Sequence, residues 1–240
     1  MYQTPSVLSR PRNSLQPLWR YLRYERLMDL LDSEELFFAH LRGLSDGLEG
    51  SLTERTRSRL FQWFYGQYHD ATLARQALET YENHRDAFFV NCWHMNDAES
   101  YLLWKVYGDR GFAIRTTFER VQISFDRFAG EVNGSVVEYI DFAREATQIG
   151  NVFTPVVKKD IPYRDEREFR LLLWQPNQAN QWIDVNAPGV RVQVDLAKLI
   201  EKIYVSPRVK EVPPALRQLL DRKSLPCPVI SSVINERVTS

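Results

Sequence analysis

The segment Asp165–Trp174 places charged side chains directly before an apolar run, in the order Asp-Glu-Arg-Glu-Phe-Arg-Leu-Leu-Leu-Trp. Side chains alternate between the two faces of a strand, so Glu166, Glu168 and Arg170 share one face, while Phe169 and the alternate leucines face a core. Carboxylates and a guanidinium are costly to bury unless they form ion pairs or take part in binding or catalysis. A carboxylate can stabilise the oxocarbenium-like cation that forms when a glycosidic bond breaks. Glu168 and Glu166 are therefore the candidate catalytic residues, with Glu168 favoured because it lies deeper in the strand and beside Arg170.

A second set of residues carries guanidinium, hydroxyl and aromatic groups that could contact a bound ligand. A guanidinium can hold an anionic group, and aromatic faces can stack on a planar ring. The candidate binding residues are Arg20, Tyr21, Trp93, Ser100 and Arg170.

Each candidate also has a structural interpretation. Glu168 and Arg170 could form an ion pair on one face of a strand, and Trp93 could be an ordinary core aromatic. Glu99 completes the capping box Asn96-Asp97-Ala98-Glu99, which predicts a helix from there to about Tyr107 that is apolar enough to be largely buried.

The elements that must position these residues mix strands and helices without a regular alternation, which predicts an α+β fold. We expect one domain over residues 18–240, with a mixed, mostly antiparallel sheet, a helical hairpin over 51–85 and flanking helices. Residues 1–17 carry proline and serine and are predicted to form a flexible arm. The strands are expected at 18–22, 36–40, 88–93, 111–116, 135–140, 165–174, 190–195, 202–205 and 229–233. Beyond the hairpin and the helix that the capping box predicts, helices are expected at 24–32, 118–128, 196–200 and 212–222.

Composition and missing motifs exclude several classes of protein. The 31 basic and 31 acidic residues balance, which argues against broad nucleic-acid binding and leaves open a local basic groove. There is no GxGxxG, no GxxxxGK[ST] and no GxSxG, and the four histidines and two cysteines lack metal-ligand spacing, so no metal is expected. No apolar run is long enough to span a bilayer, and a cytoplasmic protein with no membrane partner is predicted.

Several short motifs resemble the bacterial family called domain of unknown function 2971. They are Leu18-Trp19-Arg20-Tyr21, Leu36-Phe37-Phe38-Ala39, Asp46-Gly47-Leu48-Glu49, Cys92-Trp93, Trp104-Lys105-Val106-Tyr107, Gly111-Phe112-Ala113-Ile114 and the stretch from Lys159 to Arg170. The similarity runs from about Leu18 to Pro207 and departs at Ser45-Asp46-Gly47, where the family usually has Asn-Asp-Pro. The resemblance implies a small bacterial cytoplasmic protein, with a role in phage defence or as a toxin effector.

The chain also resembles ADP-ribosyltransferases in the order of its candidate residues. That class has an Arg or His on a first strand, an aromatic and serine-bearing central strand and a later strand with Glu-x-Glu. Arg20, the segment from Trp93 to Ser100, and Glu166-Arg167-Glu168 match this order, although the Ser-Thr-Ser triplet of the class is absent. The resemblance implies an ADP-ribosyltransferase-like enzyme that uses NAD and modifies an unknown acceptor.

Two other functions stay open. A non-catalytic module could bind a nucleotide or a partner's phosphate through Arg20, Arg170 and Lys159. A nuclease dependent on Mg²⁺ could instead use the carboxylates of Asp46, Glu49, Glu166 and Glu168 as oxygen ligands.

Overall fold

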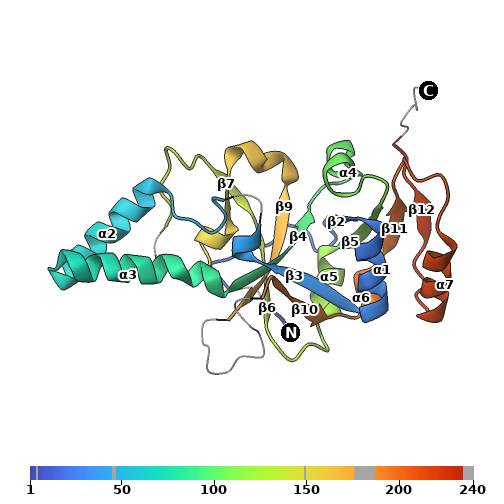
Figure 1. Ribbon diagram of the computed structural model, residues 1–240, viewed down its shortest axis with the longest axis horizontal. Coiled ribbons are helices and arrows are strands. Elements are labelled where there is room, and N and C mark those ends of the chain that lie inside the picture. Colours follow the sequence, from blue (N-terminus) through green and yellow to red (C-terminus); the bar gives the residue numbers. More distant parts are fainter. Residues whose placement is uncertain (4, 45–46, 149, 176–186, 235–240) are drawn as a thin grey trace.

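The strands β4 (Phe88–His94) and β9 (Glu168–Trp174) pair antiparallel at the centre of a large mixed sheet. The structure is a computed structural model that describes residues 1–3, 5–44, 47–148, 150–175 and 187–234. Within this part of the chain, helices and mostly antiparallel strands form one compact domain, which confirms the predicted α+β class (Figure 1).

Eight strands follow one another across the sheet in the order β1-β6-β9-β4-β2-β5-β11-β12, and β3 and β10 branch from β4. Among the described strands of this sheet, only the outer pairs β1–β6 and β11–β12 are parallel. The remaining strands of this sheet are β1 Tyr2–Gln3, β2 Pro17–Leu22, β3 Glu35–His40, β5 Phe112–Thr117, β6 Val132–Val136, β10 Gly189–Gln193, β11 Lys202–Val205 and β12 Val229–Ser231. The short strands β7 (Glu138–Ile140) and β8 (Lys158–Asp160) form a separate parallel pair.

The sheet forks at β4, because β3 and β2 lie along the same edge of that strand. Ala39 and His40 of β3 pair with the first half of β4, whereas β2 reaches β4 only at its end, where Trp19 pairs with His94. None of the described strands pairs with the backbone between these two pairings on this side. The fork is the feature of the fold that leaves room for a cavity.

The two faces of the central strands differ in what they bury. One face carries Phe169, Leu171 and Leu173 into the main apolar core, as the alternation of the sequence predicts. The opposite face carries Glu168 and Arg170, and Leu172 joins a second, smaller core there. Both faces of β9 are therefore buried, and its charged residues lie inside the protein.

Seven α-helices lie in the described part of the chain. They are α1 Tyr24–Ser33, α2 Glu54–Tyr68, α3 Ala71–Asn83, α4 Tyr101–Tyr107, α5 Phe118–Ser124, α6 Leu196–Leu199 and α7 Pro214–Arg222. Four 3₁₀ turns accompany them, η1 Leu41–Gly43, η2 His84–Ala87, η3 Pro155–Val157 and η4 Ile161–Glu166. Buried residues of α1, α5, α6 and α7 pack on the main core.

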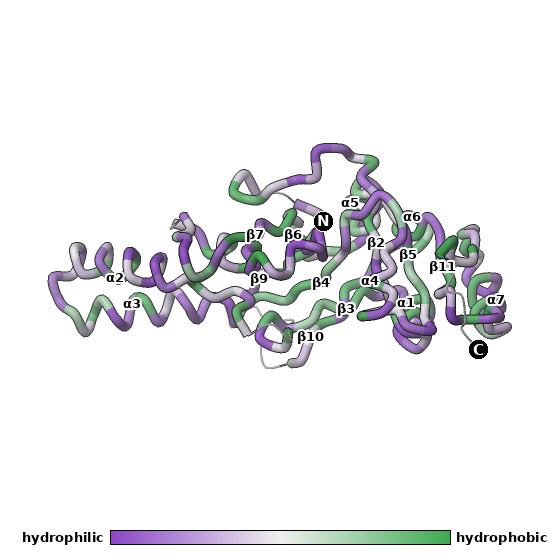
Figure 2. The backbone as a smooth tube through the Cα atoms, turned by 90° about the horizontal axis from the view of Figure 1, so that it is seen from above, coloured by the Kyte–Doolittle hydropathy of each residue, from purple (hydrophilic) through white to green (hydrophobic). Residues whose placement is uncertain are grey.

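The helices α2 and α3 form the predicted hairpin, which projects from one end of the molecule (Figure 1). Asp70 caps α3 by accepting hydrogen bonds from the backbone N–H groups of Thr72 and Leu73. The hairpin is largely hydrophilic in colour, and the strands at the centre are mostly hydrophobic (Figure 2). Its tip keeps Trp63 and Tyr68 exposed.

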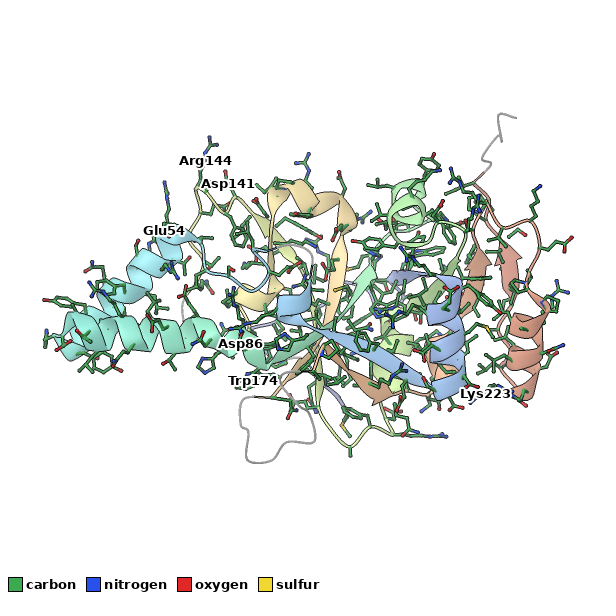
Figure 3. All side chains as sticks on the ribbon, in the orientation of Figure 1. Glu54, Asp86, Asp141, Arg144, Trp174 and Lys223 are labelled. Atoms are coloured by element: carbon green, nitrogen blue, oxygen red, sulfur yellow. The ribbon has the colours of Figure 1, made fainter. Side chains whose placement is uncertain are left out.

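At the other end of the molecule, charged side chains at the end of α7 form hydrogen bonds with the end of α1. Lys223, which lies just after α7, donates hydrogen bonds to the carbonyl of Asp32 at 2.8 Å and to Glu34 at 2.9 Å (Figure 3). Because both partners lie where α1 ends, a cation there also interacts favourably with the helix dipole.

The helix α4 begins later than the capping box predicts, which corrects the sequence-based boundary. Ser100 is the N-cap and accepts a hydrogen bond from the N–H of Leu103 at 3.3 Å. Glu99 instead accepts hydrogen bonds from the indole of Trp104 and from Ser232 near the end of the described chain. The helix is also less buried than expected, because only its residues Leu103 and Trp104 are buried.

The segment that the sequence predicts as a flexible arm contacts the sheet at several points. Tyr2 and Gln3 form β1 beside β6, and Leu8 is buried in the smaller core. The backbone N–H of Ser9 donates to the hydroxyl of Ser135 on β6 at 3.1 Å. These contacts place the first residues against the edge of the sheet.

Candidate functional site

A cavity of about 270 Å³ lies at the fork between β2, β3 and β4. Arg20 and Tyr21 line it from β2, Phe37 lines it from β3, and Cys92 and His94 line it from β4. Its remaining charged lining consists of Glu49, Lys159, Glu166 and Glu168. The cavity thus unites residues from segments far apart in the sequence.

Behind the cavity, Arg170 is completely buried, and its guanidinium donates hydrogen bonds to protein groups. Its guanidinium donates to both oxygens of Glu168, at 2.7 and 3.0 Å, in a bidentate pair. It also donates to Glu49 at 2.8 Å and to the carbonyl of Val156 at 2.7 Å. Arg170 therefore holds three segments together, which is the structural role that the sequence leaves open for it.

Lys159 joins the same group of charges from β8. Its ammonium lies 2.7 Å from Glu166, 3.2 Å from Glu49 and 3.6 Å from Glu168. We call Glu49, Lys159, Glu166, Glu168 and Arg170 the charge cluster. With three acids and two bases it has one excess negative charge when all five groups are ionised.

The pKa shifts of Glu168 and Lys159 show which charged forms the cluster stabilises. Burial by itself would raise the pKa of Glu168, but the charge and hydrogen bonds of Arg170 outweigh it and lower this pKa to about 2. Burial likewise opposes the charge on Lys159, and the carboxylates of Glu168 and Glu49 outweigh burial and raise the pKa of Lys159. Both groups are therefore ionised at neutral pH.

Arg20 stands apart from this cluster. It donates one hydrogen bond, from Nη1 to the carbonyl of Cys92 at 2.9 Å, and its guanidinium lies 5.9 Å from the ring centroid of Trp93. No carboxylate of the described residues forms an ion pair with it. Burial lowers the pKa of Arg20 to about 10, so it still carries its charge at neutral pH. The cavity therefore contains a cation that forms no ion pair with a carboxylate of the described residues.

His94 presents a hydrogen-bond acceptor to the cavity. Its Nδ1 lies 2.9 Å from the carbonyl of Glu166, and because a carbonyl only accepts, Nδ1 carries the proton. The lone pair is then on Nε2. Burial lowers the pKa of His94, which favours the neutral ring. A neutral imidazole of this tautomer can accept a hydrogen bond or a proton from a bound molecule.

Tyrosines provide much of the remaining wall. The hydroxyl of Tyr21 accepts a hydrogen bond from the N–H of Ser100 at 2.9 Å, and burial raises the pKa of Tyr21 to about 12. Tyr107 donates to Glu166 at 3.3 Å, and burial followed by the charge of Glu166 raises its pKa to about 12. The ring of Tyr163 lies 4.8 Å from the ammonium of Lys159. Tyr21 and Tyr107 are therefore neutral at pH 7, and the three rings give the cavity partly aromatic walls.

The structure brings Arg20, Tyr21, Glu166 and Glu168 to one cavity, and it places the other predicted binding residues elsewhere. Trp93 is fully buried in the main core on the opposite face of β4, where its indole donates to Asn91. Ser100 uses its hydroxyl as a helix cap. Arg170 lies behind the cavity. Asp46, which the nuclease hypothesis needs, falls outside the described residues.

The two candidate glutamates differ in their access to the cavity. Glu166 ends the turn η4, and Arg167 follows it in the left-handed region at φ 44°, so the strand begins only at Glu168. The expectation of a single strand carrying both carboxylates is corrected in this respect. The side chain of Glu166 is 20% exposed and that of Glu168 is 2% exposed. Of the two carboxylates, Glu166 is the one that a ligand can reach.

Sequence reasoning assigned no site role to His94, Tyr107 or Cys92. The alternation of β4 could have placed Cys92 and His94 on the same face, but the apolar run around Cys92 favours a core assignment. The pairing of His94 with Glu168 depends on the register between β4 and β9, which no local pattern encodes. Tyr107 is the last residue of α4, and the sequence does not predict which side of the sheet this helix packs against.

Other hollows offer weaker chemistry for a site. A wider one of about 660 Å³ lies between α1 and α7, but two of its charged residues, Asp32 and Arg222, pair with each other at 2.8 Å. Among the described residues, no group of three or more His, Cys, Asp or Glu side chains is arranged to hold a metal ion. None of the described helices has the length and apolar character needed to cross a membrane.

Comparisons with protein-family models, with curated proteins and with solved structures find no match to this chain. The family resemblance of the sequence motifs therefore stays a prediction, and the function has to be argued from the site itself.

Proposed function

We propose that the protein binds an anionic nucleotide in the cavity at the fork of the sheet. The observation that carries this proposal is the guanidinium of Arg20, which lies at the cavity wall and pairs with no carboxylate in the described part of the chain. A partly buried cation without a counter-ion is costly, and a phosphate that accepts hydrogen bonds from the guanidinium would reduce that cost.

The rest of the wall supports the same class of ligand. The acceptor Nε2 of His94 suits a ribose hydroxyl or a base amino group. The rings of Tyr21 and Tyr107 offer apolar surface to a base or a sugar. A nucleotide carries all three kinds of group, namely an anion, hydrogen-bond donors and a flat ring.

Calorimetric titration with AMP, ADP and NAD tests the proposal. We expect at least one probe to bind the unmodified protein, and Arg20→Gln to weaken that binding about tenfold or more. Arg23→Gln is the matched control, because Arg23 is an exposed arginine of the same segment that does not line the cavity. Absence of binding by all three nucleotides, or equal losses in the two variants, would overturn the proposal.

Cleavage of NAD, as in an ADP-ribosyltransferase, is the second candidate function, and the access of Glu166 to the cavity favours it. The bond between C1′ of the ribose and the nicotinamide nitrogen would break, and its electron pair would leave with neutral nicotinamide. The Glu166 carboxylate would stabilise the resulting cation. An acceptor oxygen would then bond to C1′ and lose its proton to Nε2 of His94.

This second candidate predicts release of nicotinamide from NAD, measured by chromatography. Glu166→Gln should abolish the release, and His94→Gln should slow it. Glu138→Gln is the matched control, because Glu138 is an exposed glutamate that pairs with Lys158 outside the cavity. Nucleotide binding without any nicotinamide release would leave the protein as a non-catalytic binding module.

A further inference from the structure

The segment that follows β12 is bound to Glu99, which lies just before α4. The hydroxyl of Ser232 donates to Oε2 of Glu99 at 2.6 Å, and the backbone N–H of Val233 donates to Oε1 at 3.0 Å. The N–H of Ile234 donates in turn to the hydroxyl of Ser232 at 3.1 Å. We call residues 232–234 the strap. Both oxygens of one carboxylate thus hold the strap beside α4, on the same side of the molecule (Figure 1).

Apolar contacts bind the strap to the same region. Ile234 packs against a small buried cluster, whose members are Trp19, Tyr21, Leu103, Trp104 and Ala113. Two members of this cluster belong to α4, and Tyr21 also lines the cavity at the fork of the sheet. The strap therefore lies against a cluster that includes part of the cavity wall.

The helix α4 depends on such contacts for its position. It has seven residues, of which only Leu103 and Trp104 are buried. A helix this short is unstable by itself in water. Glu99 also accepts a hydrogen bond from the indole of Trp104 at 3.0 Å, so one carboxylate joins the helix to the strap. Release of the strap would leave Trp104 as the remaining described donor to this carboxylate.

The two ends of α4 in turn position side chains of the cavity. At the first end, the N–H of Ser100 donates to the hydroxyl of Tyr21 at 2.9 Å, and the rings of Tyr21 and Trp104 lie 4.9 Å apart, edge to face. At the last end, Tyr107 donates to Glu166 at 3.3 Å. Tyr21, Tyr107 and Glu166 all line the cavity. A shift of α4 would therefore change the shape of the cavity wall.

We propose that the strap regulates the cavity: while it is bound to Glu99, α4 holds Tyr21 and Tyr107 in the geometry that binds a nucleotide, and release of the strap weakens that binding. This inference rests on the proposed nucleotide binding and adds its regulation. The strap is suited to reversible release, because β12 is a three-residue strand at the end of the described strand order and Val233 is 77% exposed.

A charge placed in the strap tests the proposal in the full chain. Ser232→Asp puts a second carboxylate beside Glu99, and the repulsion between like charges should release the strap. Calorimetric titration should then show that the tightest-binding of AMP, ADP and NAD binds about fivefold or more weakly. Ser231→Asp is the matched control, because it adds the same charge one residue earlier, at an exposed position of β12. It should leave the affinity unchanged.

A second variant shows whether the effect passes through Glu99. Glu99→Gln removes the negative charge, and its amide can donate a hydrogen bond to a carboxylate at position 232. In that background, Ser232→Asp should weaken binding by less than about twofold, because coupled positions are not additive. Urea denaturation shows whether each variant folds as stably as the unmodified protein.

The coupling should also be visible from the other side, because two coupled sites influence each other equally. A saturating concentration of the nucleotide should slow hydrogen exchange at the amide of Val233 in the unmodified protein about fivefold or more, since this amide is bonded to Glu99 only while the strap is in place.

The outcomes distinguish this inference from the proposed function on which it rests. If a nucleotide binds but Ser232→Asp leaves its affinity unchanged, or weakens it no more than Ser231→Asp does, nucleotide binding stands and the regulation is overturned. An equal loss from Ser232→Asp with and without Glu99→Gln would overturn it as well. If none of the three nucleotides binds the unmodified protein, both proposals are overturned.

Discussion

Arg170 and Arg20 lie on strands that flank β4, and their guanidinium groups are bound in opposite ways. Arg170 donates to two carboxylates and a carbonyl and has no contact with solvent. Arg20 donates to one carbonyl and faces a cavity. A buried charge that is fully paired stabilises one conformation of the protein, whereas a charge that is left unpaired can be neutralised by a ligand. The comparison separates the structural part of the site from the part that can bind.

Replacing each arginine by methionine tests this contrast most strongly. Arg170→Met leaves the carboxylates of Glu168 and Glu49 without their buried partner, and should lower the free energy of unfolding by about 3–5 kcal/mol. Arg20→Met leaves the carbonyl of Cys92 without its donor but also removes an unneutralised charge, so it should cost at most about 1–2 kcal/mol. Urea denaturation measures both values. Equal losses would mean that Arg20 is as structural as Arg170.

The pH dependence of stability tests the charge of Glu168. Its pKa in the folded protein, about 2, lies below the ordinary value of 4.5, so the unfolded chain takes up this proton first as the pH falls. The stability contributed by Glu168 is therefore complete above pH 4.5 and is lost as the pH falls toward 2, by on the order of 3 kcal/mol. Urea denaturation between pH 6 and pH 2.5 should show this loss, and Glu168→Gln should show a smaller one. Parallel curves would contradict the assignment.

Two neighbouring lysines offer a matched test of the charge cluster. Lys159 donates to Glu166 and lies near two other carboxylates, and its side chain is 8% exposed. Lys158 pairs with Glu138, whose side chain is 64% exposed. Lys159→Met should lower the free energy of unfolding by about 2–3 kcal/mol, and Lys158→Met by less than about 1 kcal/mol. A larger loss for Lys158→Met would show that burial does not govern the strength of these pairs.

The smallest expected effect is a change in the rate at which Cys92 is alkylated. Burial and then the charge of Glu168 raise the pKa of Cys92, and burial raises the pKa of Cys227 as well. Both thiols should therefore react slowly with iodoacetamide at pH 8. Glu168→Gln should speed the alkylation of Cys92 several-fold and leave Cys227 unchanged, as measured by peptide mass spectrometry. An equal acceleration of both thiols would indicate general loosening of the fold.

Much of the fold was predictable because the local patterns are strong. The apolar run of β4 and the periodicity of α1 and α7 place these elements within one or two residues, whereas β9 begins three residues later than predicted. The predicted start of α4 was wrong because Asn96 and Ser100 can both act as an N-cap. Which of the two caps the helix depends on Trp104 and Ser232, because both donate hydrogen bonds to Glu99 in the folded protein.

The candidate site was only partly predictable, because it depends on pairings between distant segments. Arg20 and Glu168 were assigned to one candidate site from their residue types, and both line the cavity. Glu49 and Lys159 complete the charge cluster only because the chain after β3 lies beside the strand β8. No local sequence pattern specifies this contact. The fork at β4 is likewise a property of strand register, so the cavity itself was not visible in the sequence.

The pairing of the central strands also determines when the chain can fold. Phe88 pairs with Trp174, and Pro17 pairs with Thr117, so the middle of the sheet needs segments that are synthesised far apart in time. The hairpin of α2 and α3 needs only neighbouring residues. During synthesis the hairpin can therefore form early, while β4 has no partner on one edge until β9 leaves the ribosome. Pulsed hydrogen exchange during refolding should accordingly protect amides of α2 and α3 before those of β4.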